Sequence, residues 1–277
     1  MLKTRVLTAL VLLAAFLSCL FYLPDAYWGG VLLLALLVGA SEWANIAAFS
    51  GRGKWIYVTA TAAFGAGLFV IGTGGLPSTV LFGISLLFWL VVAPAWLKLK
   101  WRIENRGMLV VVGWILLLPT GLALFELRAA SPVLLLGLMG VVWVSDIAAY
   151  FAGRAFGRRK LAPAISPGKT WEGVFGALAA VALYGWVWQM AGGQFLARLA
   201  LDGYALTLWG TLALWLLAYF GILGDLFESW MKRQAGMKDS GRILPGHGGV
   251  LDRIDALTST LPLAALVLIL WHLLEPI

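Results

Sequence analysis

The sequence predicts an all-α protein that crosses a membrane several times. Of its 277 residues, 62% are hydrophobic and 12% carry a charge, whereas a soluble domain is about half apolar and about a quarter charged. The mean hydropathy is +0.93, and the apolar residues gather in long runs. Because lipid offers the backbone no hydrogen bonds, these runs are expected to be helices.

Nine apolar runs are long enough to cross the hydrocarbon core as helices. Their expected limits are residues 5–23, 28–49, 55–72, 79–97, 107–126, 131–151, 172–191, 205–227 and 255–274. The first run follows two basic residues, as in a signal peptide, but no small-residue cleavage site comes after it. We therefore interpret it as an uncleaved first span.

The distribution of basic residues supports this number of spans. When the loops are assigned alternately to two sides, 18 of the 20 Lys and Arg fall on one side, and Arg128 and Arg198 on the other. Lys and Arg accumulate in the cytoplasmic loops of membrane proteins. The N-terminus and the long charged loops are therefore expected in the cytoplasm, and the net charge of +7 requires no nucleic-acid partner.

The stretch from residue 229 to residue 255 differs from everything around it, because it combines bases, acids and a Gly-rich run. Its charged members are Lys232, Arg233, Lys238, Arg242, Arg253, Asp239, Asp252 and Asp255. Its Gly-rich run is Pro245, Gly246, His247, Gly248 and Gly249.

This composition indicates phosphate chemistry. Glycines let backbone N–H groups approach an anion, and Lys and Arg neutralise its charge. Carboxylates at the same place would repel phosphate unless a divalent cation lay between them, and Mg²⁺ is commonly held by one or two carboxylates together with substrate phosphates. The alternative is a solvated charged loop between two membrane helices.

Acidic residues at two helix ends could form the cation pocket. If the eighth helix continues past its apolar part, Asp225, Glu228, Ser229 and Lys232 share one face. Asp252 and Asp255 would likewise share a face at the start of the ninth run. The alternative is that these acids pair with nearby arginines and only fix the loop.

A second polar stretch covers residues 143–173. Asp146 lies on the same helix face as Tyr150 and Gly153, and the segment from Ser166 to Thr170 (Ser-Pro-Gly-Lys-Thr) precedes the seventh apolar run. Such a turn can present N–H groups and Lys169 to an anion. The alternative is that Ser166 or Thr170 only caps the helix. In the second run, Glu42 and Asn45 could line a lipid pocket or form hydrogen bonds between helices, and we favour the second interpretation.

Both stretches resemble the phosphatidate cytidylyltransferases, also called CDP-diacylglycerol synthases. The first reads S-x-x-K-R-x4-K-D-x-G-x3-P-G-H-G-G-x-x-D-R-x-D and the second D-x-x-A-Y-x-x-G-R-x-x-G, followed by S-P-x-K-T-x-E-G. The resemblance implies that CTP and phosphatidate react to CDP-diacylglycerol and pyrophosphate, that Mg²⁺ is required, and that the site faces the cytoplasm from a bacterial inner membrane.

The resemblance also implies roles for individual residues. Asp225, Asp252 and Asp255 are expected at the metal. The expected catalytic residues are Asp225, Asp252, Lys232, Arg233, Lys238, Asp239, His247 and Arg253. The expected substrate-binding residues are Ser166, Lys169, Thr170, Asp146, Ser229, Gly246, Gly248 and Gly249. These residues lie in a C-terminal catalytic region, residues 131–277, which follows about five N-terminal spans in residues 1–130.

Other readings remain open at this point. Buried acids also suit an ion-coupled transporter, although neither inverted repeats nor helices broken at mid-membrane are visible. Another CTP-dependent membrane enzyme, either a polyprenol- or dolichol-type kinase or an isoprenoid-lipid cytidylyltransferase, would use similar residues. The sequence leaves the assembly open between a single chain and a homodimer.

Overall fold

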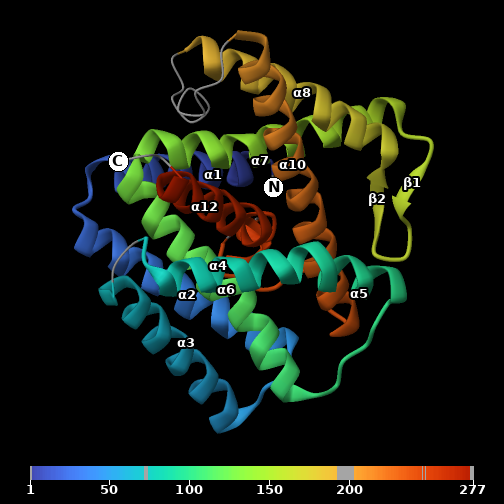
Figure 1. The fold of residues 1–277 in the computed structure, drawn as a ribbon. Coiled ribbons are helices and arrows are strands. Elements are labelled where there is room, and N and C mark those ends of the chain that lie inside the picture. Colours follow the sequence, from blue (N-terminus) through green and yellow to red (C-terminus); the bar gives the residue numbers. More distant parts are fainter. Residues whose placement is uncertain (1, 72–73, 192–202, 245, 247, 275–277) are drawn as a thin grey trace.

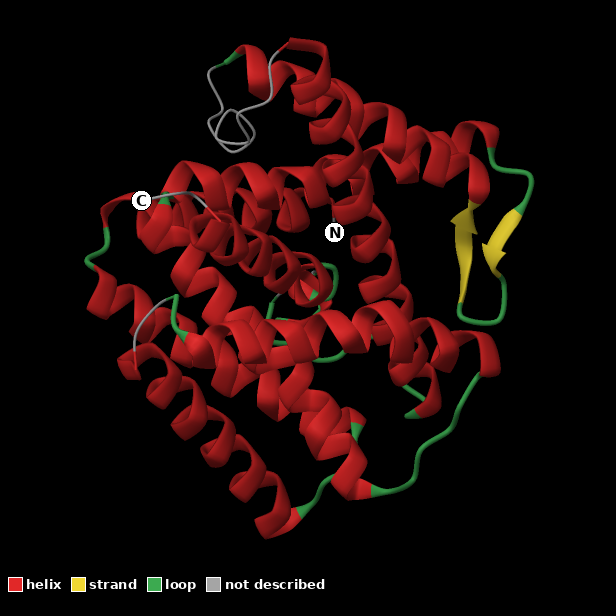
Figure 2. Ribbon diagram, in the orientation of Figure 1, coloured by secondary structure: helices red, strands yellow, loops and turns green. Residues whose placement is uncertain are grey.

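The computed structural model describes residues 2–71, 74–191, 203–244, 246 and 248–274, and most of these residues lie in helices that pack side by side (Figures 1 and 2). In chain order the elements are α1 Leu2–Tyr22, α2 Asp25–Ile46, α3 Gly51–Ile71, α4 Leu76–Leu87, the π-helical η1 Phe88–Val92, α5 Ala93–Leu99, α6 Arg106–Ala130, α7 Pro132–Phe156, β1 Lys160–Ala162, β2 Ser166–Thr170, α8 Trp171–Met190, α10 Gly203–Gln234, α11 Leu251–Ile254 and α12 Leu257–Leu274.

The helices confirm a polytopic membrane protein of the all-α class. Within the described residues, seven helices are long and apolar enough to cross a membrane. Two shorter apolar helices, Thr8–Tyr22 and Leu257–Trp271, coincide with the first and ninth predicted runs. The total of nine spans and the cytoplasmic N-terminus stay predictions.

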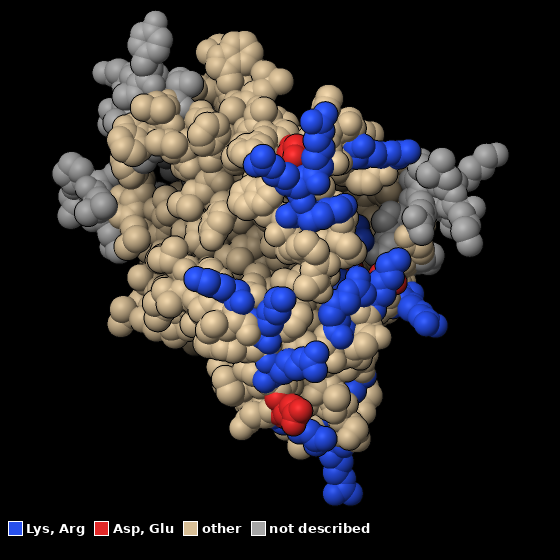
Figure 3. Space-filling view, turned by 90° about the vertical axis from the view of Figure 1, so that its right-hand side faces the viewer, with Lys and Arg blue, Asp and Glu red and all other residues tan. Residues whose placement is uncertain are grey.

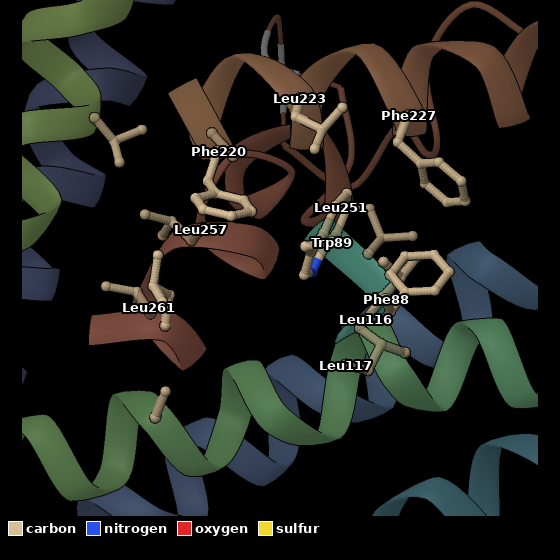
Figure 4. Close-up of a cluster of buried hydrophobic side chains, with 14 of the residues drawn as sticks. Phe88, Trp89, Leu116, Leu117, Phe220, Leu223, Phe227, Leu251, Leu257 and Leu261 are labelled. Atoms are coloured by element: carbon tan, nitrogen blue, oxygen red, sulfur yellow. The ribbon is translucent and has the colours of Figure 1, made fainter. Parts of the chain in front are cut away.

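The fourth predicted run is one continuous rod, Leu76–Leu99, with a π-helical turn inside it. In this turn the indole N–H of Trp89 donates to the carbonyl oxygen of Thr258 over 3.0 Å. The rings of Phe88 and Trp89 meet the ring of Phe227 edge-on, with centroids 5.3 and 5.6 Å apart. Figure 4 shows these side chains in the apolar cluster that joins α10, α12 and η1.

Helix α10 runs farther than the apolar pattern alone indicates, because it ends at Gln234 rather than at residue 227. The expected helical face that carries Asp225, Glu228 and Lys232 is therefore confirmed. Asp252 and Asp255, expected to share a face at the start of the ninth run, do not lie in one uninterrupted helix. The short helix α11 ends at Ile254 and α12 starts at Leu257, so the chain turns at Asp255.

A β-hairpin between α7 and α8 departs from the all-α expectation. Strands β1 and β2 pair antiparallel, with Lys160 opposite Thr170. The hairpin projects beside the C-terminal half of α10 (Figure 1). The Pro and Gly residues of this segment are poor helix formers. Pairing between the two strands satisfies backbone N–H and C=O groups in place of helical hydrogen bonds.

Helices α7 and α8 support the hairpin by packing very closely. A Cβ placed on Gly176 would come within 2.3 Å of Ala152 Cβ, and one on Gly173 within 2.8 Å of the Ala149 carbonyl oxygen. Small residues let helix backbones approach each other in this way. The two helices therefore fix the base from which the hairpin extends.

Lys and Arg gather over one side of the molecule (Figure 3). The exposed basic residues of the described chain include Lys98, Lys100, Arg102, Arg106, Arg154, Arg158, Arg159, Lys160, Arg233, Lys238, Arg242 and Arg253. This grouping agrees with the uneven division of basic residues between the two sets of loops.

Candidate active site

The polar residues of the two unusual stretches meet at the C-terminal half of α10. An ion pair connects the hairpin to this helix: Nζ of Lys169 lies 2.6 Å from Oδ2 of Asp225. The other oxygen, Oδ1, accepts a 3.2 Å hydrogen bond from Ser229 Oγ one turn farther along α10. The structure therefore brings together three predicted site residues that are up to 60 positions apart in sequence.

Lys232 forms the second connection, between α10 and α11. Its ammonium group lies 2.8 Å from Oε2 of Glu228 and 2.5 Å from Oδ1 of Asp252. All three side chains are at least 90% buried from solvent. A buried charge requires a partner of opposite sign, so this ammonium and its two carboxylates hold the end of α10 against α11.

Asp252 organises the Gly-rich loop with its second oxygen. Oδ2 accepts hydrogen bonds from Ser240 N at 2.9 Å, from Ser240 Oγ at 2.9 Å and from Gly249 N at 2.8 Å. With Lys232 on Oδ1, the carboxylate has four donors, which is about its full capacity. Burial alone would raise the pKa of Asp252, but the hydrogen bonds from Lys232 and the two backbone amides hold it below its ordinary value.

Glycines let the loop close around this carboxylate. Gly246 and Gly248 have positive φ angles of 76° and 80°, a conformation that glycine adopts without strain. A Cβ on Gly248 would lie 2.6 Å from Oδ2 of Asp252. The amide of Leu244 donates to the carbonyl oxygen of Gly248 over 3.0 Å and closes the turn. His247, also a predicted site residue, lies outside the described residues.

A group of four carboxyls lies beside this loop. Asp255 at the α11–α12 turn interacts electrostatically with Asp225, Glu228 and Asp146, the last contributed by α7. Burial, followed by the charges of Asp225 and Glu228, raises the pKa of Asp255 well above its ordinary value. Glu228 Oε1 is buried and has no hydrogen-bond partner in the described structure. Acids from two helices, α7 and α10, and from the α11–α12 turn therefore lie close enough to interact electrostatically.

Acids of this group are the candidate ligands for the predicted divalent cation. Within the described residues, no three His, Cys, Asp or Glu side chains form a ready-made metal site. Mg²⁺, however, is usually held by one or two carboxylates plus phosphate oxygens and waters. The unpartnered oxygen of Glu228 and the crowded carboxyls of Asp225 and Asp255 are suitable ligands of this kind. Asp252 already accepts four hydrogen bonds, three of them on Oδ2, and its metal role stays a prediction.

Several of the remaining predicted residues are charged side chains near the protein surface. Lys238, Asp239 and Arg253 are exposed, and Arg233 donates to the Met237 carbonyl oxygen over 3.3 Å. Arg253 also acts electrostatically on Asp146. These groups are available to a ligand approaching from the basic side.

Thr170 and Ser166 have different positions in the hairpin. Thr170 is buried, and its Oγ1 accepts a 3.2 Å hydrogen bond from Gly173 N at the start of α8. This is the capping role that the sequence allowed as an alternative, and its substrate role stays a prediction. Ser166 is the half-buried first residue of β2, and nothing in its surroundings tests its predicted role.

Sequence reasoning gave no role to two residues that hold the site. Glu172 accepts hydrogen bonds from the amides of Arg158 and Arg159, at 3.0 and 3.2 Å, and so fixes the basic entry to the hairpin. Ser240 is fully buried and bonds to Asp252. The position of Glu172 in the first turn of α8 could have indicated a structural role, because acids stabilise helix N-termini. Nothing in the sequence indicates the role of Ser240.

Comparison with known proteins shows the family of this chain. The pattern of the cytidylyltransferase family matches residues 3–271. The chain belongs to this family. It is similar to the phosphatidate cytidylyltransferase of Pseudomonas aeruginosa, with 38% identity over 97% of both chains. The enzyme of the same name from Haemophilus influenzae is 34% identical over 95% of this chain and 96% of its own. The one from Brucella suis is 37% identical over 93% and 90%.

Proposed function

We propose that this protein transfers the cytidylyl group of CTP to phosphatidate, with CDP-diacylglycerol and pyrophosphate as products. A phosphate oxygen of the lipid attacks the α-phosphorus of CTP and forms the new P–O bond. The bond from the α-phosphorus to the oxygen that bridges it to the β-phosphate breaks, and pyrophosphate leaves. The lipid phosphate is itself the nucleophile, so the protein needs no Ser or Cys nucleophile.

The observation that carries this proposal is the likeness to relatives named phosphatidate cytidylyltransferase over nearly the whole of both chains. The site supports it independently. A reaction between two phosphorylated substrates requires positive charge and positioning more than covalent catalysis. Buried Lys232, half-buried Lys169 and the exposed basic residues around them supply such charge at one place.

Different basic residues would contact different phosphate groups of the two substrates. Lys169, on the hairpin, would exchange its contact with Asp225 for a substrate phosphate. Lys238, Arg233 and Arg253 would neutralise the β- and γ-phosphates and the departing pyrophosphate. Lys232 would remain inside, since Glu228 and Asp252 already hold it, and would keep the α10–α11 contact in place during the reaction.

Mg²⁺ would be held by Asp225 and Asp255 with help from Glu228. When bound there, it would neutralise phosphate oxygens and stabilise the charge that develops on them. Asp146 would add negative charge to the same region from α7. Asp252 would orient the loop through Ser240 and Gly249 rather than bind the cation.

The site would face the cytoplasm from a bacterial inner membrane. The basic side of the molecule and the location of CTP in cells support this orientation. The proposed reaction uses residues of one chain, and a homodimer stays a prediction. Light scattering of the detergent-solubilised protein measures whether one or two copies are present.

Product analysis tests the proposal. Purified protein is incubated with CTP, Mg²⁺ and phosphatidate, and both CDP-lipid and pyrophosphate are measured. We expect equal amounts of the two products and no product when phosphatidate is omitted. Release of CDP together with a phosphorylated lipid would instead indicate a kinase. Turnover with a polyprenyl phosphate but not with phosphatidate would indicate another lipid substrate.

A further inference from the structure

Glu42 is a buried acid in the N-terminal half of the chain that contacts the Gly-rich loop directly. It lies on α2 and is 3% exposed. Its Oε1 accepts a hydrogen bond from Val250 N at 3.0 Å, and its Oε2 accepts from Leu251 N at 2.8 Å and from Ser240 Oγ at 3.1 Å. These donors are about 200 residues away in sequence.

Two glycines leave room for this carboxylate. A Cβ on Gly241 or on Gly249 would lie 2.4 Å from Oε1 of Glu42. A real Cβ atom essentially never comes this close to a neighbour, so a side chain at either position would force the carboxylate or the loop to shift. The loop therefore approaches α2 at both its entry, next to Ser240, and its exit, next to Val250.

Ser240 joins Glu42 to the residues of the candidate site. Its hydroxyl lies 3.1 Å from Oε2 of Glu42 and 2.9 Å from Oδ2 of Asp252. Asp252 in turn holds Lys232. One continuous set of buried polar contacts thus leads from α2 through the loop to α10.

We propose that Glu42 is a positioning residue for the reaction, one that fixes the Gly-rich loop and through Ser240 sets the place of Asp252 and Lys232. This inference rests on the proposed function, because the loop matters only if it carries phosphate-binding groups. Glu42 itself contacts none of the basic side chains that the proposed reaction assigns to substrate phosphates. It also gives the N-terminal spans a role, since α2 supplies a contact that the C-terminal region does not contain.

The two backbone contacts favour a carboxylate. Oε1 and Oε2 of Glu42 each face a backbone amide that can only donate, and an ionised carboxylate is an acceptor only. The single hydroxyl hydrogen of Ser240 is shared between Glu42 and Asp252. In Glu42→Gln, the amide nitrogen would replace one oxygen and face a backbone N–H, so at least one bond would be lost and two donors would oppose each other. In Glu42→Asp the carboxylate is one methylene shorter, and it would not reach both ends of the loop.

The test compares Glu42→Gln and Glu42→Asp with Glu126→Gln as a matched control. Glu126 is also a buried acid, 7% exposed, and lies near the C-terminal end of α6. It accepts hydrogen bonds from Ser78 Oγ and Gly74 N, which lie outside the Gly-rich loop. Activity is measured as kcat/KM, and hydrogen exchange is measured at the amides of Ser240, Gly249, Val250 and Leu251.

We expect both Glu42 variants to lose about 100-fold in kcat/KM, since small misplacements of catalytic groups have effects of this size. Exchange at the four loop amides should become faster, while exchange in α6 and α7 stays the same. The Glu126→Gln variant should keep kcat/KM within about threefold and leave loop exchange unchanged. Near wild-type activity of Glu42→Gln, or lost activity with unchanged loop exchange, would overturn the inference.

A double-mutant cycle separates positioning from a general loss of stability. If Glu42 acts through Ser240, the combined variant Glu42→Gln with Ser240→Ala should lose less activity than the product of the two single losses. Fully multiplicative losses would contradict the inference. If the wild-type protein forms no CDP-lipid at all, the proposed function fails, while the exchange measurement still tests whether Glu42 holds the loop.

Discussion

Nζ of Lys169 lies 2.6 Å from Oδ2 of Asp225 and joins the β-hairpin to α10. The side chains are 24% and 30% exposed, so the pair lies at the edge of the solvent rather than deep in the protein. A pair in this position is available to both a phosphate and a metal ion. The hairpin and the acid group are therefore expected to bind substrate together.

Lys169→Gln is expected to lower kcat/KM by about 100-fold, because it removes a charge that would contact a phosphate. Most of the loss should be seen at low CTP concentration. The matched control is Lys160→Gln, which removes an exposed Lys from β1 of the same hairpin. A Lys169→Gln enzyme as active as the Lys160→Gln enzyme would exclude the proposed contact.

Gly248→Ala is expected to disrupt the loop. Its φ angle of 80° costs a residue with a side chain about 1–2 kcal/mol, and its Cβ would meet Asp252 Oδ2 at 2.6 Å. Activity should fall by at least about tenfold. Gly83→Ala, on α4 where a Cβ has open space, should leave activity unchanged. Equal activity of both variants would show that the loop tolerates the substitution.

Much of the fold could be predicted from the sequence because the physical rule behind it is local. Runs such as residues 107–126 and 131–151 must be helical in lipid, and α6 and α7 appear at these places. The hairpin could not be predicted in this way. Its strands are three and five residues long, and their pairing depends on how α7 and α8 place its two ends.

The sequence could predict which residues belong to the candidate site, but not which of them contact each other. Spacing along α10 places Asp225 and Lys232 on one face, and the structure confirms this. No rule of sequence spacing predicts that Lys232 bridges Glu228 and Asp252. Nor does one predict that Asp252 accepts hydrogen bonds from Ser240 and Gly249 of the loop. Those partners are set by tertiary packing, as is the contact between Glu42 and residues about 200 positions later.

The lowered pKa of Asp252 predicts an acid-dependent loss of stability. A carboxyl whose pKa is depressed on folding stabilises the protein above its unfolded pKa of about 3.9, and this contribution is lost as the pH falls through the folded pKa. The wild-type protein should therefore unfold at a higher temperature than Asp252→Asn at pH 6. The difference should shrink as the pH approaches 3. A constant difference over that range would contradict the assigned hydrogen bonds.

Removal of divalent cations is expected to stop the reaction. A chelator should abolish CDP-lipid formation, and added Mg²⁺ should restore it. Asp255→Asn should raise the Mg²⁺ concentration for half-maximal activity by about tenfold, since it removes one proposed ligand charge. Glu126→Gln serves again as the control with an unchanged Mg²⁺ requirement. Full activity in chelator would exclude the metal role.

The most direct test of the account is to measure CDP-lipid and pyrophosphate formed by the wild-type protein and by Asp225→Asn in parallel. Both proteins are first shown to have the same folded, membrane-inserted fraction. The account predicts equal amounts of the two products from the wild type and a loss of at least about 100-fold in Asp225→Asn. Near wild-type product formation by Asp225→Asn, or a wild type that releases CDP in place of pyrophosphate, would contradict it.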